Sequence, residues 1–387
     1  MIRILDSTLR EGEQTPGVYF DGHIKTSIAN LLDEIGIDII EAGHPAVTEE
    51  IHEGTKRIAD MNLNATIGAH ARSLREDVSQ ALSCGVDFIG IFYCVSDLRL
   101  RDRAKSIVTV VDQIADAIRY AKSVNPKITI RYTPEDTVRS SFDNVIFAAE
   151  AAVRAGADII SIADTTGYMV PGTKRSMYDY ISRFKTALKK KGLHPEIAVH
   201  CHNDRGLALA NSLDALRAGA NIIDASVLGL GERAGITDLA SLLSVLVSDF
   251  GYQKRWNLKR IPELYKLVSQ YAKMEIPANF PINGKHAFTH CAGVHTQAAI
   301  RNPVHYQSLS PALFGRKPQI SLDHMSGISA IRHALEEIGY RDLEPECLSA
   351  ILARVKGVGQ HGRVVDRREL TYITEFVRNQ IRTEASA

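Results

Sequence analysis

Two histidines that are two residues apart, His200 and His202, follow a short apolar run at residues 197–200. If that run is a β-strand, both imidazoles point to the same side of it, because side chains alternate along a strand. Two imidazoles on one face are half of a metal site. A structural pair that hydrogen-bonds to neighbouring loops would have the same spacing, so the pair alone leaves both interpretations open.

Residues 6–17 (DSTLREGEQTPG) add the groups that such a half-site lacks. They follow another apolar run, residues 2–5, and contain the carboxylates of Asp6 and Glu11 and the guanidinium of Arg10. Two imidazoles and one carboxylate leave coordination positions open, which is typical of a catalytic metal site. Arg10 would supply a fixed positive charge for an oxyanion. The alternative is that Asp6 and Arg10 form a buried structural pair.

The elements that must bring these residues together follow a repeated pattern. A glycine, an apolar residue, Asp or Asn and two apolar residues recur, and each occurrence follows an amphipathic stretch. The glycine suits the left-handed residue after a helix, and the apolar residues suit a buried parallel strand. The pattern occupies residues 36–40, 85–89, 156–160 and 219–223, and further apolar runs lie at 2–5, 65–68, 128–132 and 197–200.

Helical periodicity separates these eight strand candidates. Eight strand–helix alternations predict an α/β fold of the (β/α)8 TIM-barrel type, in which the residues at the carboxyl ends of the strands share one mouth. A doubly wound open sheet is the alternative, but it would gather its functional residues at one switch point. The expected helices of this part are residues 22–35, 74–83, 104–124, 142–155, 177–191 and 207–218.

The alternation stops after about residue 251, and a segment rich in histidine follows at residues 286–302. We therefore expect a catalytic barrel domain at residues 1–275 and a helical appendage at residues 276–387. The helices expected here are residues 261–273, 329–338, 345–356 and 368–382.

The composition is that of an ordinary globular protein, with 45% hydrophobic and 24% charged residues. A formal net charge of +1 argues against nucleic acid or a membrane surface as the main partner. No leader segment or membrane-spanning run is expected. The cysteines are few and widely spaced, which favours reduced thiols in a cytoplasmic protein. They are Cys84, Cys94, Cys201, Cys291 and Cys347.

Three motifs together resemble the family of homocitrate, 2-isopropylmalate and citramalate synthases: residues 6–14 (DSTLREGEQ), 200–204 (HCHND) and 229–235 (GLGERAG). The resemblance implies an acyltransferase that condenses acetyl-CoA with a 2-oxo acid. It also implies one divalent metal ion, such as Zn, Mn, Mg or Co, bound by Glu11, His200 and His202. Asp6 and Asn203 would then surround the ligands.

The glycine-rich motif at residues 229–235 is expected as a rim loop near a phosphate or a carboxylate. Many relatives carry an Asn after its last glycine, and this Asn helps to hold the metal. This chain has Ile236 there. The resemblance therefore implies that water or substrate fills the fourth position.

The same resemblance assigns substrate contacts to residues 131–136 and 163–167. Thr133 and Thr165 would bind substrate carboxylates, and Glu135 would belong to an acid/base network. Thr-Pro-Glu is equally suitable as the start of a helix, with Pro at its first position.

Residues 289–295 (THCAGVH) match a family segment that crosses to a neighbouring subunit and delivers a catalytic histidine. This match implies a homodimer in which His295, or else His290, takes a proton from the methyl group of acetyl-CoA. Glu135 would orient this base. Arg10 would stabilise the charge that develops at the substrate ketone, and thioester hydrolysis would make the reaction irreversible.

The residues that would select the 2-oxo acid point to different substrates. His70 occupies a homocitrate synthase position and His44 adds a polar group, which favours a dicarboxylic acid. Leu100 is more typical of isopropylmalate synthases, although Arg99, Arg101 and Arg103 lie nearby. We expect a homocitrate synthase-like activity. The alternatives are a 2-isopropylmalate, citramalate, citrate or phosphonomethylmalate synthase, a metal-dependent lyase or aldolase, and a non-catalytic scaffold. No leucine-regulatory domain is expected.

Overall fold

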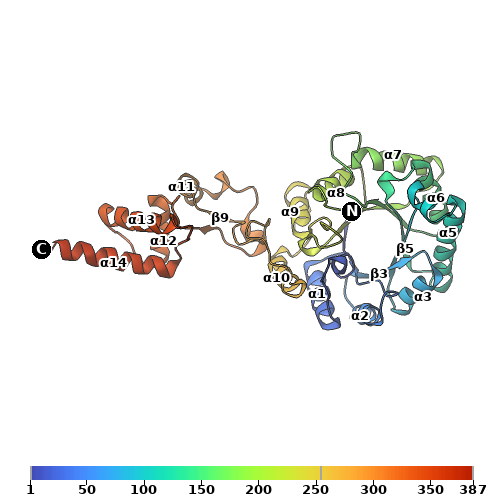
Figure 1. The fold of residues 1–387 in the computed structure, drawn as a ribbon, viewed down its shortest axis with the longest axis horizontal. Coiled ribbons are helices and arrows are strands. Elements are labelled where there is room, and N and C mark those ends of the chain that lie inside the picture. The colour runs from blue at the N-terminus through green and yellow to red at the C-terminus, as the bar shows by residue number, and fades with distance from the viewer. Residues whose placement is uncertain (1, 253–254, 386–387) are drawn as a thin grey trace. The chain divides into compact units, whose positions relative to one another are not determined.

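A computed structural model of the chain describes residues 2–252 and 255–385 (Figure 1). The chain divides into two compact units, Met1–Glu275 and Ile276–Ala387. Within the described residues, no helix has the length and apolar character that crossing a membrane requires.

The first unit is a closed barrel of eight parallel strands, which confirms the predicted TIM barrel and excludes the open sheet. Neighbouring strands follow one another in chain order, and β1 pairs with both β2 and β8 to close the ring. The strands are β1 Arg3–Asp6, β2 Ile39–Glu41, β3 Thr66–Arg72, β4 Phe88–Cys94, β5 Thr129–Glu135, β6 Ile159–Asp164, β7 Glu196–Cys201 and β8 Ile222–Ala225.

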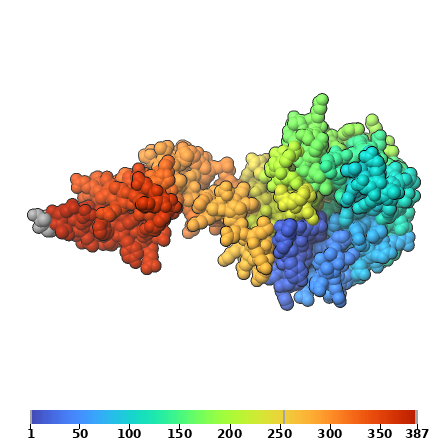
Figure 2. All heavy atoms as spheres, viewed as in Figure 1, coloured from blue at the N-terminus to red at the C-terminus, as the bar shows by residue number. Residues whose placement is uncertain are grey.

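Helices surround the ring, and its centre is covered by atoms in the space-filling view (Figure 1, Figure 2). The glycines of the repeated pattern (Gly36, Gly85, Gly156, Gly219) all have positive φ, between 76° and 115°, as their position after a helix requires. The helices are α1 Gly22–Ile35, α2 Glu49–Ala59, α3 Arg75–Ser83, α4 Asp97–Asp102, α5 Ile107–Val124, α6 Phe142–Ala155, α7 Met177–Lys190, α8 Ala208–Arg217, α9 Leu239–Asp249 and α10 Ile261–Ala272. Short 3-10 helices are η1 Gly12–Gln14, η2 Thr137–Arg139, η3 Val227–Gly229 and η4 Leu258–Arg260.

Three helices of this unit, α2, α4 and α9, are absent from the expected set, and one expected helix begins later. α9 is apolar on nearly every face (LASLLSVLVSD), so it lacks the periodic signal of a half-buried helix. The predicted helix at 104–124 begins only at Ile107, because the side chain of Ser106 caps it by accepting from the backbone N–H of Thr109.

An apolar layer fills the barrel below the mouth. It consists of Leu5, Ile39, Phe88, Ile159, Ala198 and Ile222, each from a different strand. Side chains two positions apart lie on the same side of a strand. The next layer toward the mouth therefore consists of Ser7, Glu41, Gly90, Ser161, His200 and Asp224. The barrel therefore changes from an apolar floor to a polar layer within two residues, and that polar layer is the base of the mouth.

The second unit is mainly helical and has its own core, formed by buried residues of α12, α13 and α14 that include Ile331, Leu335, Leu348, Ile351 and Leu370. It also contains a two-stranded parallel sheet. Its elements are β9 Thr289–His290, α11 Gly293–Arg301, η5 Pro303–His305, η6 Pro311–Phe314, β10 Gln319–Ile320, α12 Ile328–Glu337, α13 Pro345–Gly359 and α14 Arg367–Ala385.

Candidate metal centre and active site

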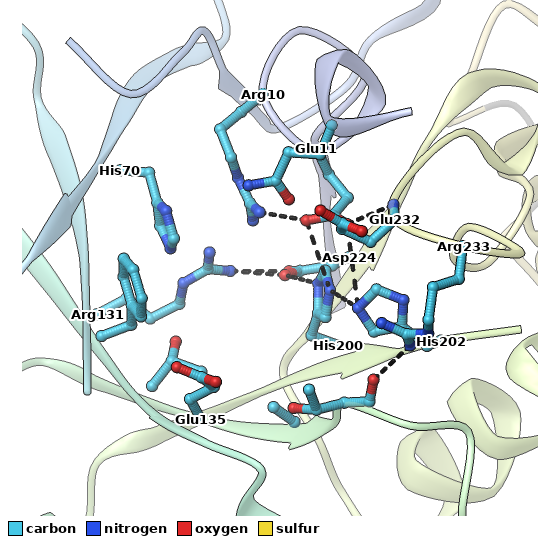
Figure 3. Close-up of a pocket in the computed structure, with 15 residues that line it drawn as sticks. Arg10, Glu11, His70, Arg131, Glu135, His200, His202, Asp224, Glu232 and Arg233 are labelled. Carbon is cyan, nitrogen blue, oxygen red and sulfur yellow. Dashed lines mark hydrogen bonds and ion pairs between the residues drawn. The ribbon is translucent and has the colours of Figure 1, made fainter. Parts of the chain in front are cut away.

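Glu11, His200 and His202 meet at the mouth of the barrel (Figure 3). All three are buried, and their nearest potential ligand atoms lie within 4.8 Å of one another. The Nε2 atoms of the two imidazoles are 3.3 Å apart, and each lies 4.0 Å from a carboxylate oxygen of Glu11. A cation placed between the three would need only small side-chain movements to reach the ~2 Å bonds of a divalent metal. Among the described residues, this is the one group of three such donors.

Asp224, at the end of β8, orients His200. Its Oδ2 lies 3.0 Å from Nδ1 of the imidazole, which directs Nε2 toward Glu11 and His202. A carboxylate on the far nitrogen of a ligating histidine fixes its tautomer and raises its basicity. Asp224 was not among the residues singled out in the sequence. Its alternation with Ile222 along the strand is the signal that indicates it.

The glycine-rich loop at residues 229–235 holds Glu11 from the other side. The backbone N–H of Glu232 donates to Oε1 of Glu11 over 3.1 Å, and Thr15 exchanges hydrogen bonds with the backbone of Gly231. A Cβ at Gly231 would come within 3.0 Å of the Glu11 side chain. The loop therefore binds the carboxylate of the protein's own Glu11, and glycine allows the close approach.

The electrostatic environment keeps these donors in metal-binding forms. Burial alone would raise the pKa of Glu11, but the guanidinium of Arg10 and the nearby imidazoles hold it below its usual value. Burial, with a smaller contribution from His200, lowers the pKa of His202 to about 4. At neutral pH the carboxylate is therefore ionised and the His202 imidazole is neutral, which is what metal coordination requires.

Arg10 is fixed by a network of buried charges. It bonds to Glu11 through Nη1, and its Nε donates to Glu41 over 2.6 Å. Arg131 donates from Nη2 to the other oxygen of Glu41 over 3.0 Å. Its Nη1 donates to both oxygens of Asp224, each over 2.9 Å. Burial opposes ionisation of Glu41, yet the two arginines hold its pKa well below the usual range. Every charge in this network therefore has a buried partner of opposite sign.

Gly90 leaves the space for this network. A Cβ there would lie 3.2 to 3.3 Å from Glu41, His70 and Arg131. Glu41 was missed in the sequence, although it ends a buried strand, where an ionisable residue is uncommon without a function or a partner. Glu41, rather than Asp6, is the carboxylate that orients Arg10.

Lys25 stabilises the loop after β1, which carries Arg10. Its ammonium group is buried and donates to Glu13 over 2.6 Å and to the backbone carbonyls of Leu9 and Ala42. The lysine thus joins the loop after β1, which carries Arg10, to the segment after β2. Burial lowers the pKa of Lys25, and the carboxylate of Glu13 opposes that shift.

The metal-ligand group forms one side of a pocket of about 310 Å³. Four residues assigned from the sequence, namely His70, Thr133, Glu135 and Thr165, line it together with Arg10. The ring of His70 stacks on that of Phe92, with centroids 4.5 Å apart, and Thr165 accepts a hydrogen bond from the backbone of Asp136. The structure therefore brings the predicted substrate contacts and the donor group into one cavity (Figure 3).

The remaining predicted residues lie outside this cavity. Asp6 accepts hydrogen bonds from the backbone and hydroxyl groups of Thr8, and burial raises its pKa to about 7. The amide oxygen of Asn203 accepts from the backbone of Ala208, the first residue of α8. Ile236 is buried, and its backbone bridges to that of His202.

His290 and His295 belong to the second unit. His295 lies on α11, and its ring centroid is 4.4 Å from that of Tyr306. His290 lies on β9, with its ring 6.3 Å from the same tyrosine. Glu135, which was expected to orient the base, belongs to the first unit and lies 3.7 Å from the guanidinium of Arg99.

The fold and the donor group define a TIM-barrel protein with three side chains that could hold a metal ion at the carboxyl ends of its strands. The family described as "HMGL-like" matches residues 1–268, and the chain belongs to it. Residues 282–363 match the "Homocitrate synthase post-HMGL domain-like" family.

The relatives agree with this assignment. A homocitrate synthase of Pyrococcus horikoshii is 43% identical over 91% of this chain and 94% of its own length. One from Saccharolobus islandicus is 39% identical over 92% of this chain and 76% of its own. A solved hydroxymethylglutaryl-CoA lyase from Pseudomonas aeruginosa has a TM-score of 0.60 at 21% identity and covers 74% of this chain and 95% of that one, which indicates the shared fold.

Proposed function

We propose that this protein is an acyltransferase of the homocitrate synthase type, which condenses acetyl-CoA with a dicarboxylic 2-oxo acid and hydrolyses the thioester. The observation that carries the proposal is the convergence of Glu11, His200 and His202 beside Arg10, in a chain whose relatives are homocitrate synthases.

A divalent metal in this donor group would act as a Lewis acid on the carboxylate and ketone oxygens of the 2-oxo acid. Zinc, manganese, magnesium and cobalt are all candidates, because this donor set does not select one of them. Arg10 lines the same pocket, and its Nη2 is not used by Glu11 or Glu41. That nitrogen is available to stabilise the negative charge that develops on the ketone oxygen.

The distal carboxylate of the acid would lie against His70 and Arg131, with the hydroxyl of Thr133 nearby. All three line the pocket, and Nε of Arg131 is buried without a hydrogen-bond partner. Arg131 lines the pocket with its charge already matched by Glu41 and Asp224, so it differs from the exposed arginines near Leu100 that were considered in the sequence. Leu100 itself is buried. These contacts favour a dicarboxylic acid such as 2-oxoglutarate over the branched 2-oxoisovalerate.

Proton removal from the methyl group of acetyl-CoA is assigned to His295, with His290 as the second candidate. Glu135 lies at the pocket edge and would orient this base once the segment that carries it is in place. We propose that the segment comes from a second copy of the chain in a homodimer. All five cysteines are free, which suits the cytoplasmic location proposed for the enzyme.

Release of free thiol from acetyl-CoA tests this function. The purified protein, loaded with each divalent metal in turn, is assayed with 2-oxoglutarate, 2-oxoisovalerate, pyruvate, oxaloacetate and phosphonopyruvate. We expect the highest kcat/KM with 2-oxoglutarate. A preference for 2-oxoisovalerate would overturn the dicarboxylate assignment, and no thiol release with any acceptor would overturn the synthase function.

A further inference from the structure

The segment that follows β4 at the barrel mouth carries four cations within seven residues: Arg99, Arg101, Arg103 and Lys105. All four are exposed. The segment starts beside the pocket, because Cys94 at the end of β4 pairs in register with Glu135 of β5. Arg99 reaches that pocket residue, with its guanidinium 3.7 Å from the carboxylate.

The other cations of this segment differ from most arginines at the mouth. Three of those arginines each donate from two nitrogens to one carboxylate. The pairs are Arg72 with Asp77, Arg139 with Asp136, and Arg233 with Asp204. No ion pair within residues 2–252 and 255–385 joins Arg101, Arg103 or Lys105 to a carboxylate. The segment does contain acidic residues, but Asp97 accepts a hydrogen bond from Asn144, and the cations outnumber the carboxylates.

An aromatic ring near the end of β4 contacts two of these cations. The guanidinium of Arg103 lies 5.1 Å, and the ammonium of Lys105 5.5 Å, from the ring centroid of Tyr93. Tyr93 follows the pocket-lining Phe92 in β4, so its ring lies on the opposite side of the strand from the pocket. Leu98 beside them is 60% exposed, so the segment offers apolar surface as well as free positive charge.

From these observations we infer that residues 98–105 bind the phosphate groups of the coenzyme A portion of acetyl-CoA. The inference rests on the proposed function, in which Glu135 orients the base that meets the acetyl group. The rest of the coenzyme would then leave the pocket past Glu135. Coenzyme A carries a diphosphate and a 3′-phosphate, and guanidinium groups bind phosphate oxygens strongly. Arginines without carboxylate partners need not break an ion pair to do so.

The test compares two triple variants of the full-length, metal-loaded protein. Arg101→Gln, Arg103→Gln and Lys105→Gln remove charge from the segment and keep most of each side chain. Arg99 is left unchanged, because it contacts Glu135. The control is Lys127→Gln, Lys189→Gln and Lys190→Gln, which removes the same charge from exposed residues before β5 and β7, at the opposite end of the barrel.

Binding of coenzyme A, 3′-dephospho-coenzyme A and pantetheine is measured by calorimetry at two ionic strengths, so the result does not depend on turnover. We expect the segment variant to bind coenzyme A about 30-fold more weakly than wild type and pantetheine equally well, since exposed charge-assisted contacts each contribute modestly. The control variant should bind all three as wild type does. Steady-state assays should show a higher KM for acetyl-CoA and an unchanged KM for the 2-oxo acid.

Equal weakening in both variants would indicate a general charge effect and would overturn the inference. So would unchanged coenzyme A binding in the segment variant, or a KM increase confined to the 2-oxo acid. If wild type releases no thiol with any acceptor but the segment variant still loses phosphate-dependent binding, the proposed function fails and the phosphate site stands.

Discussion

The two sides of the barrel mouth differ in whether their charged side chains are buried and paired or exposed without a carboxylate partner. Around the metal-ligand group, Arg10 and Arg131 are buried and share the carboxylate of Glu41, and Arg131 also pairs with Asp224. On the segment after β4, Arg101, Arg103 and Lys105 are exposed and have no carboxylate partner among the described residues. A buried charge without a partner would cost several kcal/mol, whereas an exposed one costs little.

This difference indicates two kinds of role. The buried network holds groups in fixed positions before any substrate arrives, which is what stabilisation of a developing charge requires. Among the described residues, Arg101, Arg103 and Lys105 form no carboxylate pair that a ligand would have to displace, although Lys105 donates to Gln113 and two of these cations contact Tyr93. Substitutions on the network side should therefore affect metal content, stability and turnover, and those on the exposed side should affect ligand binding.

The largest effect is expected from His200→Ala. Loss of one of three donors should reduce bound metal to well below one ion per chain. Loss of Lewis-acid assistance should lower thiol release by about 1,000-fold or more. Metal analysis and the thiol assay check this, with the exposed His23→Ala as control. A His200→Ala protein with full metal content and turnover would show that the buried side of the mouth takes no part in catalysis.

Glu41→Gln tests the stability of the buried network. It leaves the guanidiniums of Arg10 and Arg131 without their shared carboxylate and should lower the free energy of unfolding by about 3 kcal/mol at neutral pH. Because the folded-state pKa of Glu41 is depressed, its contribution is present above the unfolded pKa and is lost as the pH falls below it. The difference from wild type should therefore shrink in acid.

Urea unfolding at neutral and acidic pH measures this difference. The exposed Glu53→Gln is the matched control and should change stability little. A Glu41→Gln protein as stable as wild type at pH 7 would mean that the network does not hold the arginines in place.

Asp224→Asn tests whether the buried network increases the affinity of the donor group for metal. The amide can still approach Nδ1 of His200, but it no longer supplies the charge that raises the basicity of the imidazole. Metal affinity should fall about 10- to 100-fold, measured by competition with a chelator. An affinity within twofold of wild type would show that Asp224 serves only Arg131.

The smallest effect concerns Asp6, a buried carboxyl that forms no ion pair with any cation in the part of the chain that the structure describes. Burial raises its folded-state pKa to about 7, so the folded protein holds a proton there that the unfolded chain releases near pH 4. Its contribution to stability should therefore fall as the pH rises from about 4 to about 7. Unfolding measurements across that range should show this slope in wild type and in the exposed Asp87→Asn control. Asp6→Asn should lack it, and an equal slope in all three would contradict the assignment.

Much of this architecture was predictable because it depends on local patterns. Glycines with positive φ after helices and apolar strand runs indicated all eight strands of the barrel, and the two-residue spacing of His200 and His202 placed both imidazoles on one side. The partners of these residues were harder to find. Glu41 and Asp224 lie far from Arg10 and His200 in the sequence, and a single carboxylate at a strand end gives no local sign of the side chain that it meets.

Anomalous scattering from crystals grown with Mn²⁺ or Zn²⁺ tests the central claim most directly. The account predicts one strong peak between Glu11, His200 and His202, with an oxygen and two Nε2 atoms each about 2.0 to 2.3 Å from the ion. A metal-loaded crystal without a peak there, or with its ion bound elsewhere, would contradict the account.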